Sequence, residues 1–253
     1  MKTARATGYL GAPGTTKVTL DLDFTSVRRV LFDLDGTLYR QAPLRVLMAL
    51  ELATLPLDGP FRAAARLRAL KAYRRAQEEL RGTALDRPGE AQLAAAADAS
   101  GLPVAEIEGL VADWMHRRPL KYLQACRAPG LDRLLEVMER AGLPAGVLSD
   151  YPAQAKLAAL GLDGRFAPVL SATDPEVGAF KPSPRGFLRA CEVWGVEPGE
   201  ALFVGDRADV DAAGAEAAGM PCAIISRRPA PGGARYVVFE SLEQLSRVID
   251  SRR

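Results

Sequence analysis

From Pro129 to the C-terminus, short apolar runs alternate with segments of helical periodicity, and this pattern constrains the fold more than any other feature of the chain. Alternating strands and helices imply crossover connections and a parallel sheet. We therefore expect an α/β fold with a doubly wound parallel sheet, in which functional residues gather at the carboxyl ends of the strands. The expected elements are strands at 145–149, 168–171, 201–205, 221–226 and 236–239, and helices at 130–141, 152–160, 184–195, 207–218 and 241–249.

One expected strand, residues 28–34, lies far upstream of the others, and a long helical block separates it from them. We interpret this block as an all-helical domain over residues 43–125, inserted into a core that is formed by residues 17–42 and 126–253. The helices expected within it are at 44–52, 60–81, 90–99, 103–116 and 119–125.

The N-terminal region carries weaker signals. Residues 1–16 have no hydrophobic period and are expected to be mobile, whereas the alternating run at 18–24 predicts an additional strand or hairpin arm. The first residues lack the apolar core of a signal peptide, so we do not expect secretion. No apolar run approaches the roughly 18–20 residues that a membrane span needs, so we expect no membrane partner.

Net charge and cysteine content indicate which partners and which cellular compartment to expect. The 253-residue chain has a net charge of +2, which gives no global electrostatic reason to bind nucleic acid. Its three cysteines, Cys126, Cys191 and Cys222, are odd in number and widely spaced, without metal-ligand spacing. They are typical of reduced core thiols, so we expect a cytoplasmic protein. Its oligomeric state is open between monomer and homodimer.

The upstream strand ends in Asp33-Leu34-Asp35-Gly36-Thr37, which is the most informative motif in the chain. Alternate residues of a strand share a face, so the two carboxylates should lie on the same side, and Gly36 allows a sharp turn there. Two close acids repel each other unless a cation lies between them or one is protonated. A metal-held nucleophile and a proton-transfer group would meet this condition, although Asp and Gly also form ordinary surface turns.

Two further motifs follow the next expected strands. Ser149 and Asp150 end one strand, where a hydroxyl and backbone N–H groups can hold a phosphoryl oxygen, or where both residues can cap the next helix. Lys181 lies before a proline, with Ser183 as an expected helix N-cap and Pro184 in the first helical turn. This arrangement should direct Lys181 toward the strand ends, although a solvated loop lysine would have the same sequence.

Three acids, Asp206, Asp209 and Asp211, follow the strand at 201–205 and open the next helix. Such a cluster at a strand terminus is typical of a hard-cation site with oxygen ligands. The alternative is that Asp206 caps the helix and the other acids favour its dipole.

Together, the four motifs resemble those of the haloacid dehalogenase-like (HAD) superfamily, in the family's order and at the expected strand ends. The resemblance covers about residues 28–42 and 129–226. It implies a Rossmann-like core and places the helical block at 43–125 where a C1-type cap occurs, as in the phosphoglycolate phosphatase-like branch. Such caps close over the site, exclude water and select the substrate.

The resemblance also assigns roles to residues. Asp33 would be the nucleophile that forms an aspartyl-phosphate, and Asp35 would protonate the leaving group and then deprotonate water. An acid at Asp35 favours phosphoryl transfer over dehalogenation, because a halide leaving group needs no proton. Lys181 would neutralise charge on the nucleophile and the phosphate. The residues implied for phosphate binding are Thr37, Ser149, Asp150 and Lys181, and those implied for Mg²⁺ are Asp33, Asp35, Asp206 and Asp211, with Asp209 a weaker candidate.

We therefore expect a Mg²⁺-dependent phosphatase acting on a small phosphorylated metabolite, such as phosphoglycolate, a sugar phosphate or a nucleotide. Tyr39 and Arg40 are expected to contact substrate at the cap hinge. The alternatives are a phosphomutase, a phosphonatase that uses Lys71 or Lys121 as a Schiff base, or a non-catalytic binding protein. The basic helix at 60–81 is consistent with either an anion-attracting surface or a solvated face, and the sole histidine, His116, with a surface or capping role.

Overall fold

An eight-stranded sheet forms the centre of the molecule in the computed structural model, with the strand order β2-β1-β8-β7-β6-β3-β4-β5. The six strands from β8 to β5 are parallel, which confirms the expected doubly wound α/β fold. These strands are β3 (Arg29–Phe32), β4 (Ala145–Ser149), β5 (Val169–Ser171), β6 (Ala201–Gly205), β7 (Cys222–Ile225) and β8 (Tyr236–Phe239). The structure describes residues 5–9, 17–21, 25–54, 60–83, 87–227 and 236–251.

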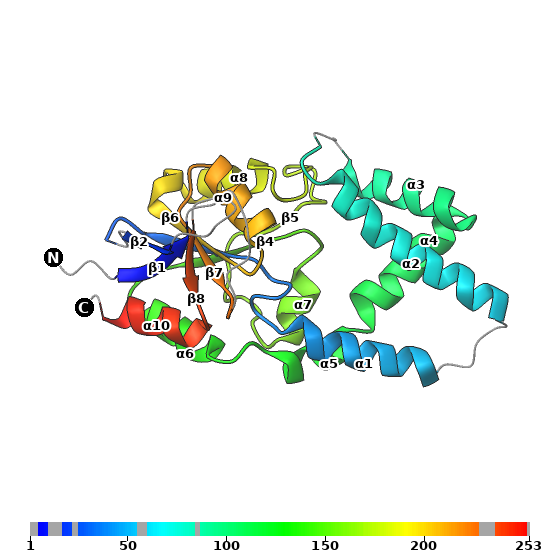
Figure 1. Ribbon diagram of the computed structural model, residues 1–253, viewed down its shortest axis with the longest axis horizontal. Coiled ribbons are helices and arrows are strands. Elements are labelled where there is room, and N and C mark those ends of the chain that lie inside the picture. Colours follow the sequence, from blue (N-terminus) through cyan, green and yellow to red (C-terminus); the bar gives the residue numbers. More distant parts are fainter. Residues whose placement is uncertain are drawn as a thin grey trace.

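Helices cover both faces of this sheet because its strands are apolar on both sides. Phe32 packs on one face with α6, α7 and α10, and Leu31 packs on the other with α8 and α9. Figure 1 shows α8 and α9 above the sheet and α6 and α10 below it. These helices are α6 (Leu131–Arg140), α7 (Gln154–Ala159), α8 (Arg185–Trp194), α9 (Ala213–Ala217) and α10 (Leu242–Asp250), and a short 3-10 helix, η3 (Pro198–Glu200), precedes β6.

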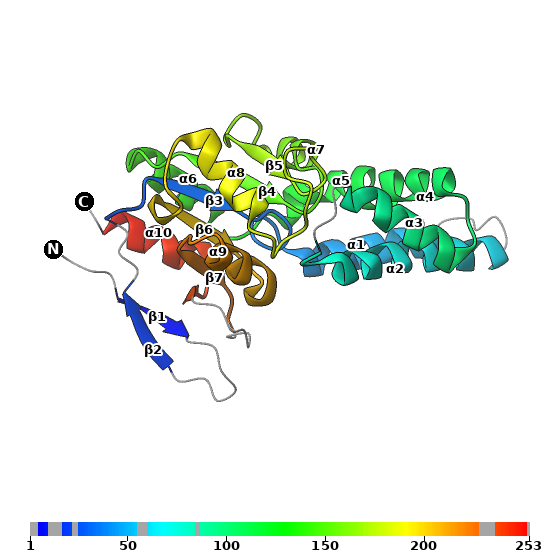
Figure 2. The ribbon, with the colours of Figure 1, turned by 90° about the horizontal axis from the view of Figure 1, so that it is seen from above.

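A helical insert separates β3 from β4 in the chain and projects from one end of the sheet (Figure 2). It has its own small core, which includes Ala69, Ala96 and Ile107, and Tyr151 of the sheet domain packs into that core. The insert consists of α1 (Gln41–Thr54), α2 (Pro60–Leu80), α3 (Pro88–Ser100), α4 (Val104–Val111), the π-helical segment η1 (Ala112–Arg117), α5 (Leu120–Leu123) and the 3-10 segment η2 (Gln124–Cys126).

The N-terminal region differs from expectation. Residues 1–16 were expected to be mobile, but β1 (Arg5–Tyr9) is a strand that pairs antiparallel with both β2 (Lys17–Asp21) and β8. Without β1, β8 would leave a row of backbone groups unpaired at the sheet edge, and the hairpin covers them. The arm expected at 18–24 is confirmed as β2 up to Asp21, and residues 22–24 lie outside the described residues.

Two helix starts also differ from expectation. The N-cap position of α8 is Pro184 rather than Ser183, and it makes no side-chain capping bond. The helix expected at 207–218 starts with a π-helical turn, η4 (Ala208–Ala212), before α9. In the described part of the chain, no helix combines the length and the apolar character that crossing a membrane requires.

Candidate active site

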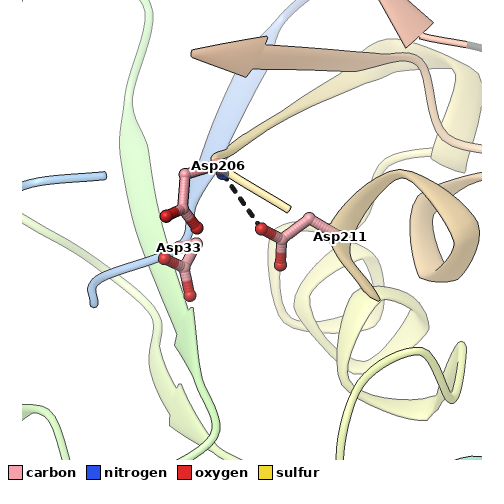
Figure 3. A group of neighbouring side chains, drawn as sticks. All are labelled: Asp33, Asp206 and Asp211. Carbon is pink, nitrogen blue, oxygen red and sulfur yellow. Dashed lines mark hydrogen bonds between the residues drawn. The ribbon is translucent and has the colours of Figure 1, made fainter. Parts of the chain in front are cut away.

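Three carboxylates meet where β3 and β6 end. Asp33 follows β3, Asp206 follows β6, and Asp211 lies in η4; each offers an oxygen, and these oxygens lie within 4.8 Å of one another. Figure 3 shows the three side chains turned toward a common point, with the Asp206 backbone N–H donating to Asp211 Oδ2 at 3.0 Å. The structure thus brings together three of the four expected metal ligands.

Gly36 and Gly205 make this close approach possible. A Cβ atom on Gly36 would lie 2.1 Å from Asp206 Oδ2, and one on Gly205 would lie 2.4 Å from Asp211 Oδ2. Gly36 also has a φ of 117°, in the region that side chains disfavour. Glycine at both positions therefore lets the chain turn and lets carboxylates lie directly against the backbone.

Lys181 is the internal counter-charge of the cluster, as expected. Its Nζ donates to Asp33 Oδ1 at 2.6 Å and to Asp211 Oδ1 at 2.7 Å, and its side chain is only 4% exposed. Burial alone would lower the pKa of Lys181, but Asp211 and Asp33 outweigh it and raise that pKa well above its usual range. Lys181 is therefore a permanent cation beside Asp33 and Asp211.

A single lysine does not balance three carboxylates, of which Asp33 and Asp211 are buried and Asp206 is half-buried. Burial and the neighbouring Asp211 and Asp206 raise the pKa of Asp33, against the effect of Lys181. Burial and Asp211 likewise raise the pKa of Asp206 to about 6. Asp33 Oδ2 is buried and has no hydrogen-bond partner among the described residues. A hard divalent cation fits this cluster, because it would satisfy the orphaned oxygen and offset the repulsion.

Asp35 is held apart from this trio by other side chains. Lys156 Nζ donates to its two carboxylate oxygens at 2.6 and 2.8 Å, and the Tyr39 hydroxyl donates to one of them. Burial would raise the pKa of Asp35, but Lys156 and Tyr39 lower it below its ordinary value. The Asp35 backbone carbonyl accepts a hydrogen bond from Gln41 and keeps a second lone pair. The Asp35 carboxylate therefore lies outside the trio, and its carbonyl oxygen is the Asp35 atom that could still contact a metal.

Lys156 is the main site residue that sequence reasoning missed. It lies on the short helix α7, where lysine among alanines resembles an ordinary solvated side chain, yet it is buried. Tyr39, expected to contact substrate, is buried and holds Asp35 in place while also lining the cavity.

The two hydroxyl residues implied for phosphate binding, Thr37 and Ser149, are buried, and neither is among the residues that line the cavity. Thr37 Oγ1 is buried without a hydrogen-bond partner among the described residues. Ser149 is also buried, and its Oγ accepts the Tyr151 backbone N–H at 3.2 Å, which leaves its own proton available for donation. Both hydroxyls can donate to a phosphoryl oxygen.

Asp150 has a different role from the expected one. Its carboxylate accepts the Lys181 backbone N–H at 3.2 Å, Gln77 Nε2 at 3.0 Å and an ion pair from Arg81 at 2.8 Å. A carboxylate with these partners would repel a phosphate, so only the Asp150 backbone N–H remains as a phosphate donor. The side chain instead ties the sheet domain to α2.

Two other expectations are not supported by the placement of the side chains. Arg40 is exposed and does not line the cavity, because the chain turns after Tyr39 and the Arg40 N–H bonds to the Cys126 carbonyl. Asp209 forms an ion pair with Arg207 at 2.7 Å and has a mostly exposed side chain, outside the carboxylate trio.

A cavity of about 590 Å³ opens above the carboxylates, between the sheet edge and the helical insert. Its floor includes Asp33, Asp35, Lys181 and Asp206, whereas α1, α2 and η1 supply the roof. The roof residues include Arg45, Met48, Leu67, Leu70, Lys71, Arg74, Trp114 and Met115. Its dimensions suit a small-molecule substrate rather than a macromolecule.

His116 lies behind this roof, outside the cavity lining. Its ring packs edge-on against Tyr151, with 5.8 Å between centroids, and its Nδ1 is buried without a partner among the described residues. Burial lowers the pKa of His116, so its position favours a packing role.

Family comparison agrees with this geometry. The haloacid dehalogenase-like hydrolase family matches residues 27–219, which include the ends of β3, β4 and β6. The chain belongs to the haloacid dehalogenase-like hydrolase family. It is therefore a member of a hydrolase family, and the matched residues include the carboxylate trio and Lys181.

Three curated relatives are named as phosphatases. The glyceraldehyde 3-phosphate phosphatase of Methanopyrus kandleri is 43% identical over 28% of this chain and 30% of its own length. The N-acetylmuramic acid 6-phosphate phosphatase of Pseudomonas aeruginosa is 30% identical over 71% of this chain and 74% of its own. A plasmid-borne phosphoglycolate phosphatase of Cupriavidus necator is 30% identical over 49% of this chain and 56% of its own. The chain thus spans less than a third of the first relative.

Solved structures of both phosphatases and dehalogenases have this fold. A dehalogenase solved with an intermediate complex is 26% identical, with a TM-score of 0.62 over 88% of this chain and 97% of its own. An HAD phosphatase from Thermococcus onnurineus is 25% identical, with a TM-score of 0.56 over 88% and 98%. The fold alone therefore leaves the choice between these two reactions to the site.

Proposed function

We propose that the protein is a Mg²⁺-dependent phosphatase that hydrolyses a small phosphomonoester through an aspartyl-phosphate on Asp33. The observation that carries this proposal is the trio of Asp33, Asp206 and Asp211 with Lys181. Three carboxylates attract a divalent cation and, through it, a phosphate dianion. Displacement of halide from a haloacid has no phosphoryl charge for a cation to neutralise, so a cation site supports phosphoryl transfer over dehalogenation.

Asp33 would act as the nucleophile. Lys181 donates to Asp33 Oδ1, and Oδ2 has no hydrogen-bond partner among the described residues. Lys181 and the cation would orient this carboxylate so that one oxygen contacts the cation and the other attacks phosphorus. The Asp33 O–P bond forms as the bond from phosphorus to the ester oxygen breaks, and water then cleaves the aspartyl-phosphate to regenerate the carboxylate. Mg²⁺ held by the trio would neutralise charge on the phosphoryl oxygens.

Asp35 would transfer the protons. Lys156 and Tyr39 hold it in the ionised form, which accepts the proton of the attacking water in the second step. A phosphate dianion bound beside it favours the protonated form, which donates to the leaving ester oxygen in the first step. The Thr37 and Ser149 hydroxyls, Lys181 and the Asp150 backbone N–H would hold the phosphoryl oxygens in place.

The helical insert would act as a cap over this site. It supplies the roof of the cavity and would limit the access of water to the aspartyl-phosphate. The product of the reaction would be inorganic phosphate and an alcohol.

A panel of phosphate esters, offered with and without Mg²⁺, tests the proposal. The wild type should release phosphate only with Mg²⁺, and Asp33→Asn should lose at least about 10³-fold in kcat because the nucleophile is absent. Asp209→Asn is the matched control, since it makes the same change at an acid outside the trio. Phosphate release by Asp33→Asn at the wild-type rate, or release of chloride from 2-chloropropionate in place of phosphate from every ester, would refute the proposal.

A further inference from the structure

One face of α2 lines the cavity along most of the helix. Leu67, Leu70, Lys71, Arg74 and Gln77 all contribute to the lining, and their spacing of three and four residues places them on a single stripe. The stripe ends at Arg81, whose guanidinium donates to the Lys181 carbonyl at 2.7 Å. The C-terminal end of α2 therefore lies at the catalytic centre, and Arg74 and Lys71 lie progressively farther from it.

Lys71 and Arg74 differ from the paired cations of the same helix. Arg66, Arg75 and Arg81 each form an ion pair with an acid. Lys71 and Arg74 form neither an ion pair nor a hydrogen bond with any residue in the described ranges, although both lie in the cavity wall.

The acids of the cavity cannot serve as their partners. Four of the floor acids already pair with other cations: Asp35 with Lys156, Asp150 with Arg81, and both Asp33 and Asp211 with Lys181. The fifth, Asp206, forms no ion pair with Lys71 or Arg74 and lies in the carboxylate trio that would hold the metal. Glu78, the acid that α2 itself contributes, pairs with Arg207 and Arg81. The cavity thus has an acidic floor that would hold a metal and a roof whose cations lack counter-charges.

We propose that the substrate carries a second anionic group, a carboxylate or a phosphate, at the end remote from the reacting phosphate, and that Lys71 and Arg74 bind it. This inference rests on the proposed phosphatase function. Arg45 on α1 adds a third cation to the roof, where it hydrogen-bonds to the neutral amide of Gln41.

The helix register gives the length of such a substrate. At 1.5 Å rise per residue, Arg74 lies about 10 Å and Lys71 about 15 Å along α2 from Arg81. These are offsets of the backbone, so a six-carbon chain together with the long Lys71 and Arg74 side chains covers the distance. The apolar side chains of Leu70, Met48 and Trp114 line the same cavity and would pack against the middle of the substrate.

Matched pairs of esters test this inference. 6-Phosphogluconate and sorbitol 6-phosphate differ by a terminal carboxylate, and fructose 1,6-bisphosphate and fructose 6-phosphate differ by a second phosphate. In at least one pair the wild type should favour the charged ester by about tenfold in kcat/KM, mainly through KM, because charge-assisted hydrogen bonds contribute at this scale. The pair that responds identifies the second anion as carboxylate or phosphate.

Variants of the roof assign the selectivity to particular side chains. In the double variant Lys71→Met and Arg74→Met, the kcat/KM for the ester with the second anion should fall to nearly that for the ester without it, so that their ratio is near one. Arg68→Met is the matched control, because Arg68 is an exposed cation of the same helix outside the cavity lining, and it should keep the wild-type ratio. Lys71→Arg should also keep the ratio, since it retains the charge but cannot form a Schiff base.

The outcomes separate this inference from the proposed function. If the esters with and without a second anion are hydrolysed with equal kcat/KM, the inference is overturned and the proposed phosphatase function stands. The same follows from a preference that survives in the double variant, because other residues would then bind the anion. Failure of the wild type to hydrolyse any ester overturns both.

Discussion

At Asp206, burial and the nearby Asp211 hold the pKa at about 6, above the ordinary value for aspartate. Between that ordinary value and pH 6, the folded protein without metal binds more protons at this site than the unfolded chain does. Its free energy of unfolding should therefore fall as pH rises through this window. Metal should reverse the loss, because binding requires the carboxylates to be deprotonated.

Asp206→Asn tests this account. Without metal, the variant should be more stable than the wild type above pH 6 by about 1–3 kcal/mol, since it removes a repelled charge. It should also lose most of the rise in Tm that Mg²⁺ gives the wild type at pH 7.5. Urea unfolding in EDTA at pH 5 and 7.5, with Asp209→Asn as control, measures both effects. If wild type and variant are equally stable at both pH values, charge repulsion among the three carboxylates does not destabilise the metal-free protein.

The ion pair between Lys156 and Asp35 should contribute measurably to stability. Lys156→Met leaves a buried Asp35 carboxylate without its cation, so we expect a loss of about 2–4 kcal/mol in unfolding free energy. The double variant with Asp35→Asn should recover most of that stability, because no uncompensated charge remains. A double-mutant cycle by urea unfolding measures the coupling, and additive effects of the two substitutions would show that the pair is not coupled.

At the scale of elements, the turn after β3 depends on Gly36. Gly36→Ala should destabilise the protein by about 2–4 kcal/mol, because it combines an unfavourable φ with a clash against Asp206. Gly164→Ala is the matched control: Gly164 also has a positive φ, but no atom lies within 4 Å of the added methyl group. The control should cost about 1 kcal/mol and keep Mg²⁺ binding by calorimetry. If both substitutions lower the free energy of unfolding equally, the close approach of Gly36 to Asp206 is contradicted.

The ends of β3, β4 and β6 could be predicted from the sequence because their motifs directly follow apolar runs, and Lys181 could be predicted from the proline and helix start after it. That local pattern correctly placed Asp33, Lys181, Asp206 and Asp211 together. It could not show that Lys156 faces inward, since one lysine on a short helix fits either face. The local pattern also could not predict β1, because its residues do not alternate between apolar and polar and the strand forms by pairing with β8 and β2.

At the scale of the whole molecule, the helical insert is fastened to the sheet domain beside the site. Arg81 on α2 pairs with Asp150 after β4, and Glu78 pairs with Arg207 after β6 at 3.0 Å. These contacts join residues far apart in the sequence, which is why no local pattern predicted them. They fix the C-terminal end of α2 against the ends of β4 and β6.

The central claim is that Asp33 becomes phosphorylated during turnover. Wild-type protein with Mg²⁺ and a hydrolysed ester can be quenched in acid and treated with borohydride, which reduces an acyl phosphate to an alcohol. Peptide mass spectrometry should then find homoserine at position 33, and only when ester was present. Continued phosphate release with unmodified aspartate at position 33, or with homoserine at another acid, would contradict the account.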